Sequence, residues 1–402
     1  MSSRANAHMR ADRQTALTRR GLLGSAAASL LVAGCDIPAL GPDGATGPSV
    51  DASGPVTVGM MLPSGGGNEG FDTVARNLEN AARLAMADLQ GAQIDLRIYQ
   101  TGGDPGRAQA LAAQAIDEGA RILLGPLLAS EARAVGPVAA QAGVNVLSFS
   151  NNPEAAAGNV FLLGPMFENT AVRLLAFAAA QDKGRVMVIS EQNESGQVAE
   201  RAIQRAAQRT GASIVAVQSY AFSQQGIVDA LPRISAAARS SGAQSIMMTA
   251  GSEGALPLLA ELLPQNSVSQ QSFQFMGLTR WDVPPATLQL GALQGGWFAL
   301  PDPQFATAFE QRYLSTYGTA PNPVAGLGLD AINLVGSLLR RGGSTPFSAE
   351  AITQPNGFVG ASGIFRLRRD GTNERGLAVA EIRNQQRVIL SPAPRSFVGG
   401  GS

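Results

Sequence analysis

The sequence predicts an α/β fold made of two lobes, each a doubly wound parallel sheet, with a C-terminal β-hairpin. From residue 56 onward, apolar segments of strand length alternate with segments whose apolar residues recur at helical spacing. These strands fall into two runs of about five, which favours two sheets over one large sheet. The tail carries short strands and an Asp-Gly pair, a strong hairpin signal. Alternation of this kind is typical of parallel sheets with right-handed crossovers.

The first run begins with a strand at 56–62, whose apolar residues do not alternate, as expected where both faces are buried. A helix at 71–89 follows, because Val74, Leu78 and Ala85 recur at helical spacing. The other strands of this run are expected at 94–99, 121–124, 144–149 and 160–163, and its other helices at 106–118 and 130–142.

The second run has the same alternation. Its helices are expected at 167–181, 196–209, 225–240 and 254–263, and its strands at 185–190, 213–219, 245–249, 273–277 and 296–300. The tail then has helices at 302–317 and 324–341 and strands at 363–368, 377–383 and 387–390, with a turn at Asp370-Gly371.

Residues 1–35 have the layout of a bacterial lipoprotein signal. Arg19 and Arg20 precede an apolar run at 21–32, and Ala33-Gly34 stands directly before Cys35, the single cysteine of the chain. The run is shorter than the roughly 20 apolar residues that span a membrane. The alternative, a buried core cysteine, lacks upstream residues to pack over it. We therefore expect 1–34 to be a removed signal peptide and Cys35 to carry a lipid that anchors the protein to a membrane.

Composition excludes several kinds of site from the processed chain. The single histidine, His8, lies in the leader, so no Ser-His-Asp or Cys-His nucleophilic site and no zinc site of His and Cys can form. Loss of the leader leaves 25 basic and 29 acidic residues, a net charge of −4. Such a chain has no electrostatic footprint for nucleic acid. We predict no metal site and no nucleic-acid partner.

Residues 35–55 are predicted to form a flexible tether behind the lipidated cysteine, because 36–55 are rich in Gly and Pro and have few bulky residues. A glycine-rich loop at 65–70 matches G-x-G-x-x-G between a strand and a helix. The next strand, however, ends in Tyr99-Gln100-Thr101 and lacks the acid that holds a nucleotide ribose. We therefore interpret 65–70 as a loop facing the cleft between the lobes and predict no cofactor.

Several stretches resemble the type I periplasmic binding protein superfamily, the Leu/Ile/Val-receptor kind. They are VTVGMMLP (56–63), ILLGPLLAS (122–130), PVA (137–139) with GVNVLS (143–148), and FVGASGIFR (358–366) with Asp370-Gly371. This resemblance implies two lobes joined by three crossovers, which we place near Gly164, Pro301 and Pro346. Lobe 1 is expected at 56–164 plus 302–345, lobe 2 at 165–301 plus 346–392, and the location in the periplasm at either the inner or the outer membrane.

A narrower resemblance concerns function. GPLL (125–128), LSFSNNP (147–153) and VFLLG (160–164) are similar to segments of the penicillin-binding protein activator lipoproteins. The resemblance implies a non-catalytic protein that contacts a peptidoglycan synthase, a penicillin-binding protein, and modulates its activity.

The alternative is a solute receptor of an ABC transporter, which binds amino acids or related small polar ligands in the cleft at the carboxyl ends of the strands. In lobe 1 these ends supply hydroxyl and amide groups. In lobe 2, Ser195 stands where receptors often have a tyrosine. The candidate ligand residues are Ser64, Ser130, Ser148, Ser150, Asn151, Glu191, Ser252, Glu253, Thr279 and Trp281. Ser130 and Ser252 precede expected helices and suit helix N-caps equally well, and Trp281 suits core packing.

An enzyme is a third possibility. Glu191 and Glu194 form a pair of carboxylates of the kind that glycosidases use. Acids at this spacing on a loop are usually only solvated, so we expect no catalysis.

Overall fold

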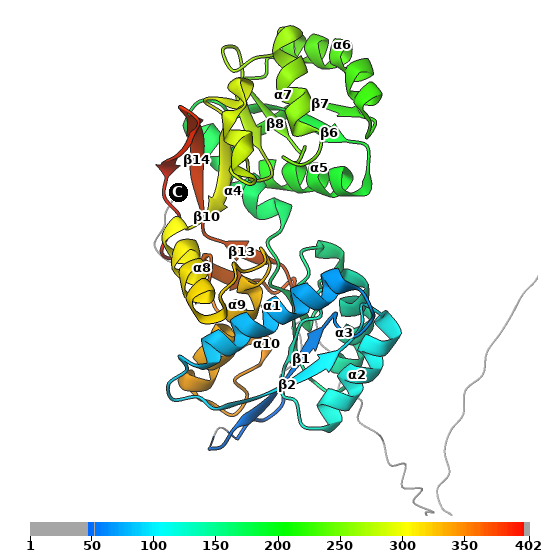
Figure 1. Ribbon diagram of the computed structural model, residues 1–402, viewed down its shortest axis with the longest axis vertical. Coiled ribbons are helices and arrows are strands. Elements are labelled where there is room, and N and C mark those ends of the chain that lie inside the picture. Colours follow the sequence, from blue (N-terminus) through cyan, green and yellow to red (C-terminus); the bar gives the residue numbers. More distant parts are fainter. Residues whose placement is uncertain (1–46, 52, 398–402) are drawn as a thin grey trace, which may run out of the picture. The chain divides into compact units, whose positions relative to one another are not determined.

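The computed structural model describes residues 47–51 and 53–397; the expected signal peptide and Cys35 lie outside them. The first run forms a five-stranded parallel sheet in the order β2-β1-β3-β4-β5 (Figure 1). Its strands are β1 (Val56–Leu62), β2 (Ile94–Gln100), β3 (Leu123–Leu124), β4 (Val146–Ser148) and β5 (Val160–Leu162).

Helices cover both faces of this sheet because successive residues of β1 point to opposite sides. Val58, Met60 and Leu62 lie in one core cluster with α1 (Glu69–Met86) and α9 (Gly326–Arg341). Met61 lies in a second cluster with apolar residues of α2 (Pro105–Asp117) and α3 (Ala129–Gln141). The continuous apolar character of β1 thus follows from burial on both faces.

The second run forms a seven-stranded sheet in the order β15-β14-β10-β9-β8-β6-β7. The strands β6 to β10 pair in parallel, whereas β14 pairs antiparallel with β10 and with β15. They span β6 (Arg185–Glu191), β7 (Ser213–Tyr220), β8 (Ser245–Met248), β9 (Gln274–Gly277), β10 (Trp297–Pro301), β14 (Leu377–Arg383) and β15 (Gln386–Ser391). The predicted fold class, with its C-terminal hairpin, is confirmed.

The two faces of the second sheet carry separate cores (Figure 1). One cluster contains apolar residues of α4 (Phe167–Ala180) and α5 (Glu194–Ala207). The other contains those of α6 (Gln224–Ser240) and α7 (Leu256–Gln265). None of the helices in the described residues has the length and apolar character that a membrane crossing requires.

A three-stranded antiparallel sheet lies between α9 and β14 in the chain. Its strands are β11 (Phe358–Gly360), β12 (Gly363–Leu367) and β13 (Asn373–Arg375), and the short helix α10 (Ala349–Ile352) precedes it. The predicted Asp370-Gly371 turn joins β12 to β13. Phe358, Phe365 and Leu367 are buried in the core cluster of α1 and α9.

Because of this packing, the third crossover between the lobes lies later in the chain than the sequence predicts. The first two run between β5 and α4 and between β10 and α8 (Pro303–Tyr317). The third lies at Gly376, between β13 and β14, and not near Pro346. The physical reason is that the chain from Phe347 to Leu367 buries most of its apolar side chains in the first lobe. In the structure, lobe 2 therefore receives only the hairpin β14–β15 from the tail.

The end of the expected tether also packs against lobe 1. Val50 is 8% exposed and lies in the core cluster of α1 and α9. Its backbone N–H donates to the carbonyl of Ser344 at 2.9 Å. Val50 thus holds the end of this stretch against the lobe.

Candidate functional site

The serines at the strand ends of lobe 1 mainly hold their own loops. Ser148 is fully buried, and its hydroxyl donates to the carbonyl of Pro126 at 2.9 Å. Ser150 is 4% exposed, and its hydroxyl oxygen accepts the N–H of Asn152 at 3.2 Å. The backbone carbonyl of Ser64 accepts the N–H of Gly102. These bonds shape the loops at the strand ends of lobe 1.

Neither candidate N-cap caps a helix. Ser130 is the second residue of α3, whose N-cap is Leu128. The hydroxyl of Ser252 donates to the carbonyl of Arg280 at 2.9 Å, and α7 begins only at Leu256. Ser252 therefore joins the loop after β8 to the loop after β9.

Glu191 and Glu194 do not act as a pair. The Glu191 carboxylate accepts the hydroxyl of Tyr220 at 3.1 Å and the side-chain N–H of Asn193 at 3.1 Å. Burial, together with the charge of Glu191, raises the pKa of Tyr220, so its hydroxyl stays a donor. Glu194 is exposed at the start of α5 and lines a cavity that Glu191 does not line. The partners of the Glu191 carboxylate are thus Tyr220 and Asn193, and not Glu194.

Trp281 is a core residue. Its side chain is fully buried in the cluster of α6 and α7, with its ring centroid 6.5 Å from that of Phe298. A Cβ at Gly277 would lie 2.2 Å from the indole nitrogen, so the glycine makes room for the ring. The indole therefore cannot stack on a ligand in the cleft, and packing is the role that the structure gives it.

The loop at 65–70 is a helix-capping loop. The Asn68 side-chain oxygen accepts the N–H groups of Gly70 and Phe71 at the start of α1. A Cβ at Gly66 would lie 2.4 Å from the carbonyl oxygen of Gly102, so the loop lies directly on the loop after β2. Within the described residues, no group of three or more His, Cys, Asp and Glu side chains could hold a metal ion.

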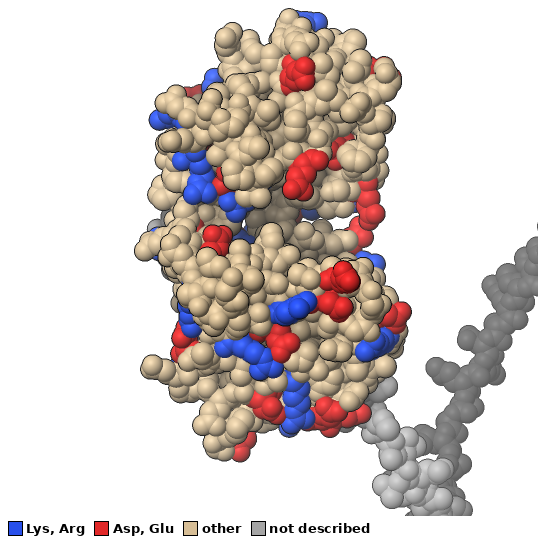
Figure 2. All heavy atoms as spheres, in the orientation of Figure 1, with Lys and Arg blue, Asp and Glu red and all other residues tan. Residues whose placement is uncertain are grey.

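A cavity of about 820 Å³ brings together three of the predicted ligand residues, Ser252, Glu253 and Thr279. They follow β8 and β9 in lobe 2. Across from them lie residues of α8 and of the loop before α9, which belong to lobe 1 by their packing. The further lining residues with a charged or an aromatic side chain are Arg280, Asp282, Arg387, Phe309 and Glu310. On the face drawn in Figure 2, acidic and basic side chains form small groups of both signs among uncharged residues.

The strongest charge cluster of this cavity is centred on Asp282. Arg280 donates to both carboxylate oxygens of Asp282 at 2.8 Å, and Arg387 donates to one of them at 2.7 Å. Burial alone raises the pKa of Asp282, but the bonds and charges of the two arginines outweigh it and hold this pKa below its usual value. Asp282 is therefore ionised at neutral pH.

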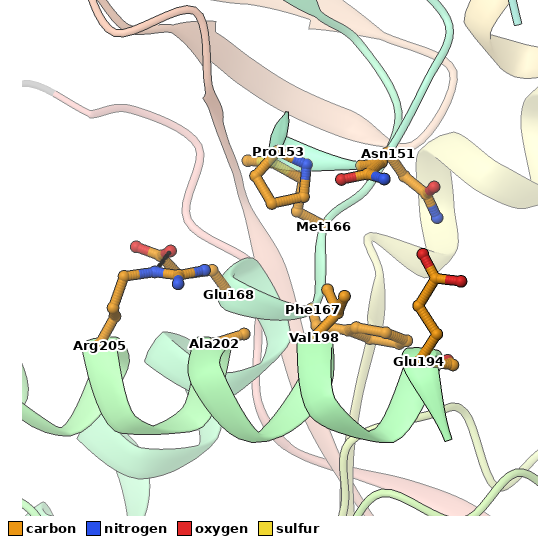
Figure 3. Close-up of a pocket in the computed structure, with 11 residues that line it drawn as sticks. Asn151, Pro153, Met166, Phe167, Glu168, Glu194, Val198, Ala202 and Arg205 are labelled. Atoms are coloured by element: carbon orange, nitrogen blue, oxygen red, sulfur yellow. Dashed lines mark hydrogen bonds and ion pairs between the residues drawn. The ribbon is translucent and has the colours of Figure 1, made fainter. Parts of the chain in front are cut away.

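A smaller cavity, of about 290 Å³, contains Asn151 (Figure 3). Glu194 extends from α5 toward Asn151, and Met166, Phe167 and Val198 also line this space. At the other end Arg205 donates to Glu168 at 2.9 Å, and Arg209 donates to the second oxygen of the same carboxylate at 2.7 Å. This volume lies at the low end of ordinary ligand pockets, whose range begins near ~300 Å³.

The comparison with protein families covers most of the chain. A family model described as periplasmic binding protein matches residues 55–387. The chain belongs to the periplasmic binding protein family. Membership implies a periplasmic location, and members are generally non-catalytic solute receptors. No sequence among the curated proteins matches this periplasmic binding protein.

Solved structures share the fold of this periplasmic binding protein. A protein of Rhodospirillum rubrum, described as a candidate branched-chain amino acid ABC transporter, is 20% identical with a TM-score of 0.70; the match covers 84% of this chain and 100% of that one. An ABC transporter substrate-binding protein of Desulfitobacterium hafniense in complex with Leu is 18% identical, with a TM-score of 0.60 and coverage of 83% and 99%. A solute binding protein of an ABC transporter of Rhodopseudomonas palustris in complex with 3,4-dihydroxybenzoic acid is 16% identical, with a TM-score of 0.56 and coverage of 85% and 97%.

Sequence reasoning missed the arginines of this periplasmic binding protein. Arg280 directly follows the predicted Thr279 at the end of β9, so its position at a strand end was a usable signal. Arg387 is the second residue of the last strand, and no local pattern relates it to Asp282, 105 positions earlier in the sequence. Only the pairing of β14 with β10 brings the two together.

Proposed function

We propose that this protein is a non-catalytic solute receptor of an ABC transporter, which binds an amino acid or a related small polar ligand between its lobes. The observation that carries the proposal is the 820 Å³ cavity, because residues of both lobes line it. A ligand held there contacts both lobes and favours their closure about the crossovers, the motion that such proteins use.

Two further features support a receptor. The cavity contains charges of both signs, which suit the ammonium and carboxylate groups of an amino acid. The similar structures are of ABC transporter solute-binding proteins, two of them in complex with small carboxylic acids. The resemblance to penicillin-binding protein activators, with a peptidoglycan synthase as partner, gains no comparable support from the similar proteins.

A thermal-shift screen of the full chain against the common amino acids tests the proposal. We expect at least one of them to raise Tm by about 2 °C or more at saturating concentration. Gly254→Phe should abolish this rise, because Gly254 is exposed and lines the cavity, where a phenyl ring would occupy ligand space.

Gly291→Phe is the matched control. Gly291 is also exposed, has no atom within 4 Å of an added Cβ and does not line this cavity. The rise in Tm should survive in this variant. A screen in which no amino acid shifts Tm would contradict an amino acid as the ligand, and a shift that persists in Gly254→Phe would contradict a receptor site in this cavity.

We also propose that the receptor is a lipoprotein anchored through Cys35. The supporting observation is the signal layout of residues 19–35. An alkyne fatty acid fed to expressing cells should label the wild-type chain and leave Cys35→Ala unlabelled. Equal labelling of both chains would exclude this anchor.

A further inference from the structure

Asp282, Arg280 and Arg387 form a prebuilt charge cluster in the wall of the 820 Å³ cavity. The Asp282 side chain is 4% exposed, whereas those of Arg280 and Arg387 are each 38% exposed. The buried carboxylate thus sits behind two guanidinium groups that still reach the cavity. One carboxylate neutralises two arginines only in part, so one positive charge remains in excess.

The hydrogen bonds to Asp282 leave donors on both arginines. Arg280 uses Nε and one Nη on Asp282, and Arg387 uses one Nη. A guanidinium carries more N–H donors than these bonds occupy, in a planar fork that matches a carboxylate. The N–H groups on the exposed edges of the two guanidinium groups can therefore donate to a second carboxylate, which would lie on the cavity side of Asp282.

Hydrogen bonds within the protein hold this cluster in place. Arg280 comes from the loop after β9 and Arg387 from the start of β15, and the bidentate bond holds the Arg280 guanidinium in one orientation. Pre-ordered side chains lower the entropy lost on binding. The loop is held in turn, because Ser252 donates to the carbonyl of Arg280.

The other lining residues restrict which anion can enter. Glu253 and Glu310 are exposed and line the same cavity, so they repel a second negative charge on the ligand. Phe309 and the half-exposed Val283 provide apolar surface. A ligand with one carboxylate and an apolar body can accept hydrogen bonds from the arginines and pack against the apolar surface. A diacid or a phosphate ester brings a second negative charge, which Glu253 and Glu310 repel.

We propose that Arg280 and Arg387 anchor the carboxylate of a monocarboxylic acid with an apolar body. This inference rests on the proposed function, since it names the anchor and the ligand class of that same cavity. The carboxylate is required, and an ammonium group on the ligand is optional.

Calorimetric titration of the full chain with matched probes tests this anchor. The probes are 3-phenylpropanoate, L-phenylalanine and phenylalaninol, together with 4-methylpentanoate, L-leucine and leucinol. At least one carboxylate of these two series should bind, and the alcohol of its series should bind at least ~30-fold more weakly, because a charge-assisted hydrogen bond is lost. An alcohol that binds as tightly as its carboxylic acid would overturn the proposal.

Arg387→Met should lower the affinity for the carboxylate probe by about 10- to 100-fold. Arg387→Lys should restore part of this lost affinity. The fold survives this change because Asp282 keeps both bonds from Arg280. Arg383→Met is the matched control, since Arg383 lies in the same hairpin, pairs with Glu381 and does not line the cavity.

The results of these titrations distinguish a failure of the arginine anchor from a failure of the receptor function. If a carboxylate probe binds and Arg387→Met binds it with unchanged affinity, the arginine anchor is wrong while the receptor function stands. If no probe and no amino acid binds, both proposals fail.

Discussion

Two buried carboxylates of this protein have opposite surroundings. Asp282 lies against two arginines, which lower its pKa. Glu131, in the first turn of α3, is fully buried, and no cation of the described residues contributes to its pKa shift. Burial raises the pKa of Glu131 and the nearby charge of Asp104 adds to this, while the Thr101 side chain and the Leu128 N–H offset only part of it. Folding therefore favours an ionised Asp282 and a protonated Glu131.

The raised pKa of Glu131 predicts a pH-dependent contribution to stability. Below its unfolded pKa of about 4.5 the group is protonated in both states. As pH rises above that value, the unfolded state loses the proton first, and the free energy of unfolding falls until the folded carboxyl also ionises. Glu131→Gln should remove this fall and make the protein more stable than wild type at pH 7.

Urea unfolding at several pH values between 4 and 8 measures this effect. Glu69→Gln is the control, because Glu69 also lies in the first turn of a helix but is exposed. We expect its pH profile to match that of the wild type. A Glu131→Gln profile that keeps the wild-type fall above pH 4.5 would show that Glu131 is not the cause.

At the scale of elements, one close helix contact organises lobe 1. A Cβ at Gly328 on α9 would lie 2.1 Å from the carbonyl oxygen of Leu78 on α1, so the two helix backbones approach as only glycine allows. The buried apolar residues of α9 then fill the same core as β11 and β12. This close packing explains why the tail sheet stays with lobe 1.

At the scale of the whole molecule, a buried ion pair lies where the chain passes between the lobes. Asp330 of α9 is 1% exposed and Arg375, next to the third crossover, is 6% exposed, with 2.9 Å between them. Asp330 also accepts the N–H of Ala361 at 2.7 Å, and Arg375 donates to the carbonyl of Leu163 at the first crossover. The pair thus ties α9 to two of the three crossovers.

This arrangement predicts a strong and non-additive effect on stability. Arg375→Met should lower the free energy of unfolding by about 3 kcal/mol or more, because it leaves Asp330 buried and unpaired. The double variant Arg375→Met with Asp330→Asn should recover part of that loss, since the uncompensated charge is gone.

Denaturant unfolding of the single and double variants measures the coupling. For comparison, Arg383→Met removes a pair at the surface, and it should change stability by at most about 0.5 kcal/mol. Additive effects of the Arg375 and Asp330 changes would show that the two charges do not depend on each other.

The predictability of this protein follows from the range of the interactions involved. Elements such as β1 and β14 were predictable to the residue, because their apolar runs are local signals. The short strands β11 and β13 carry no such pattern and form only by pairing with β12. Among the candidate ligand residues, Ser252, Glu253 and Thr279 follow strand ends and line one cavity. Trp281 also follows a strand end but is buried in the core, because the sequence does not record which way a side chain points.

The sequence by itself determined the α/β class, the two runs of strands and the hairpin, all of which depend on residues that are neighbours in the chain. Only the tertiary structure decided that the segment from Phe347 to Leu367 packs in lobe 1 and that the third crossover lies at Gly376. It also decided that Arg387 meets Asp282 beside the cavity. The physical reason is that core burial and ion pairing act between residues far apart in the chain, and their partners are chosen by the packing of the whole fold.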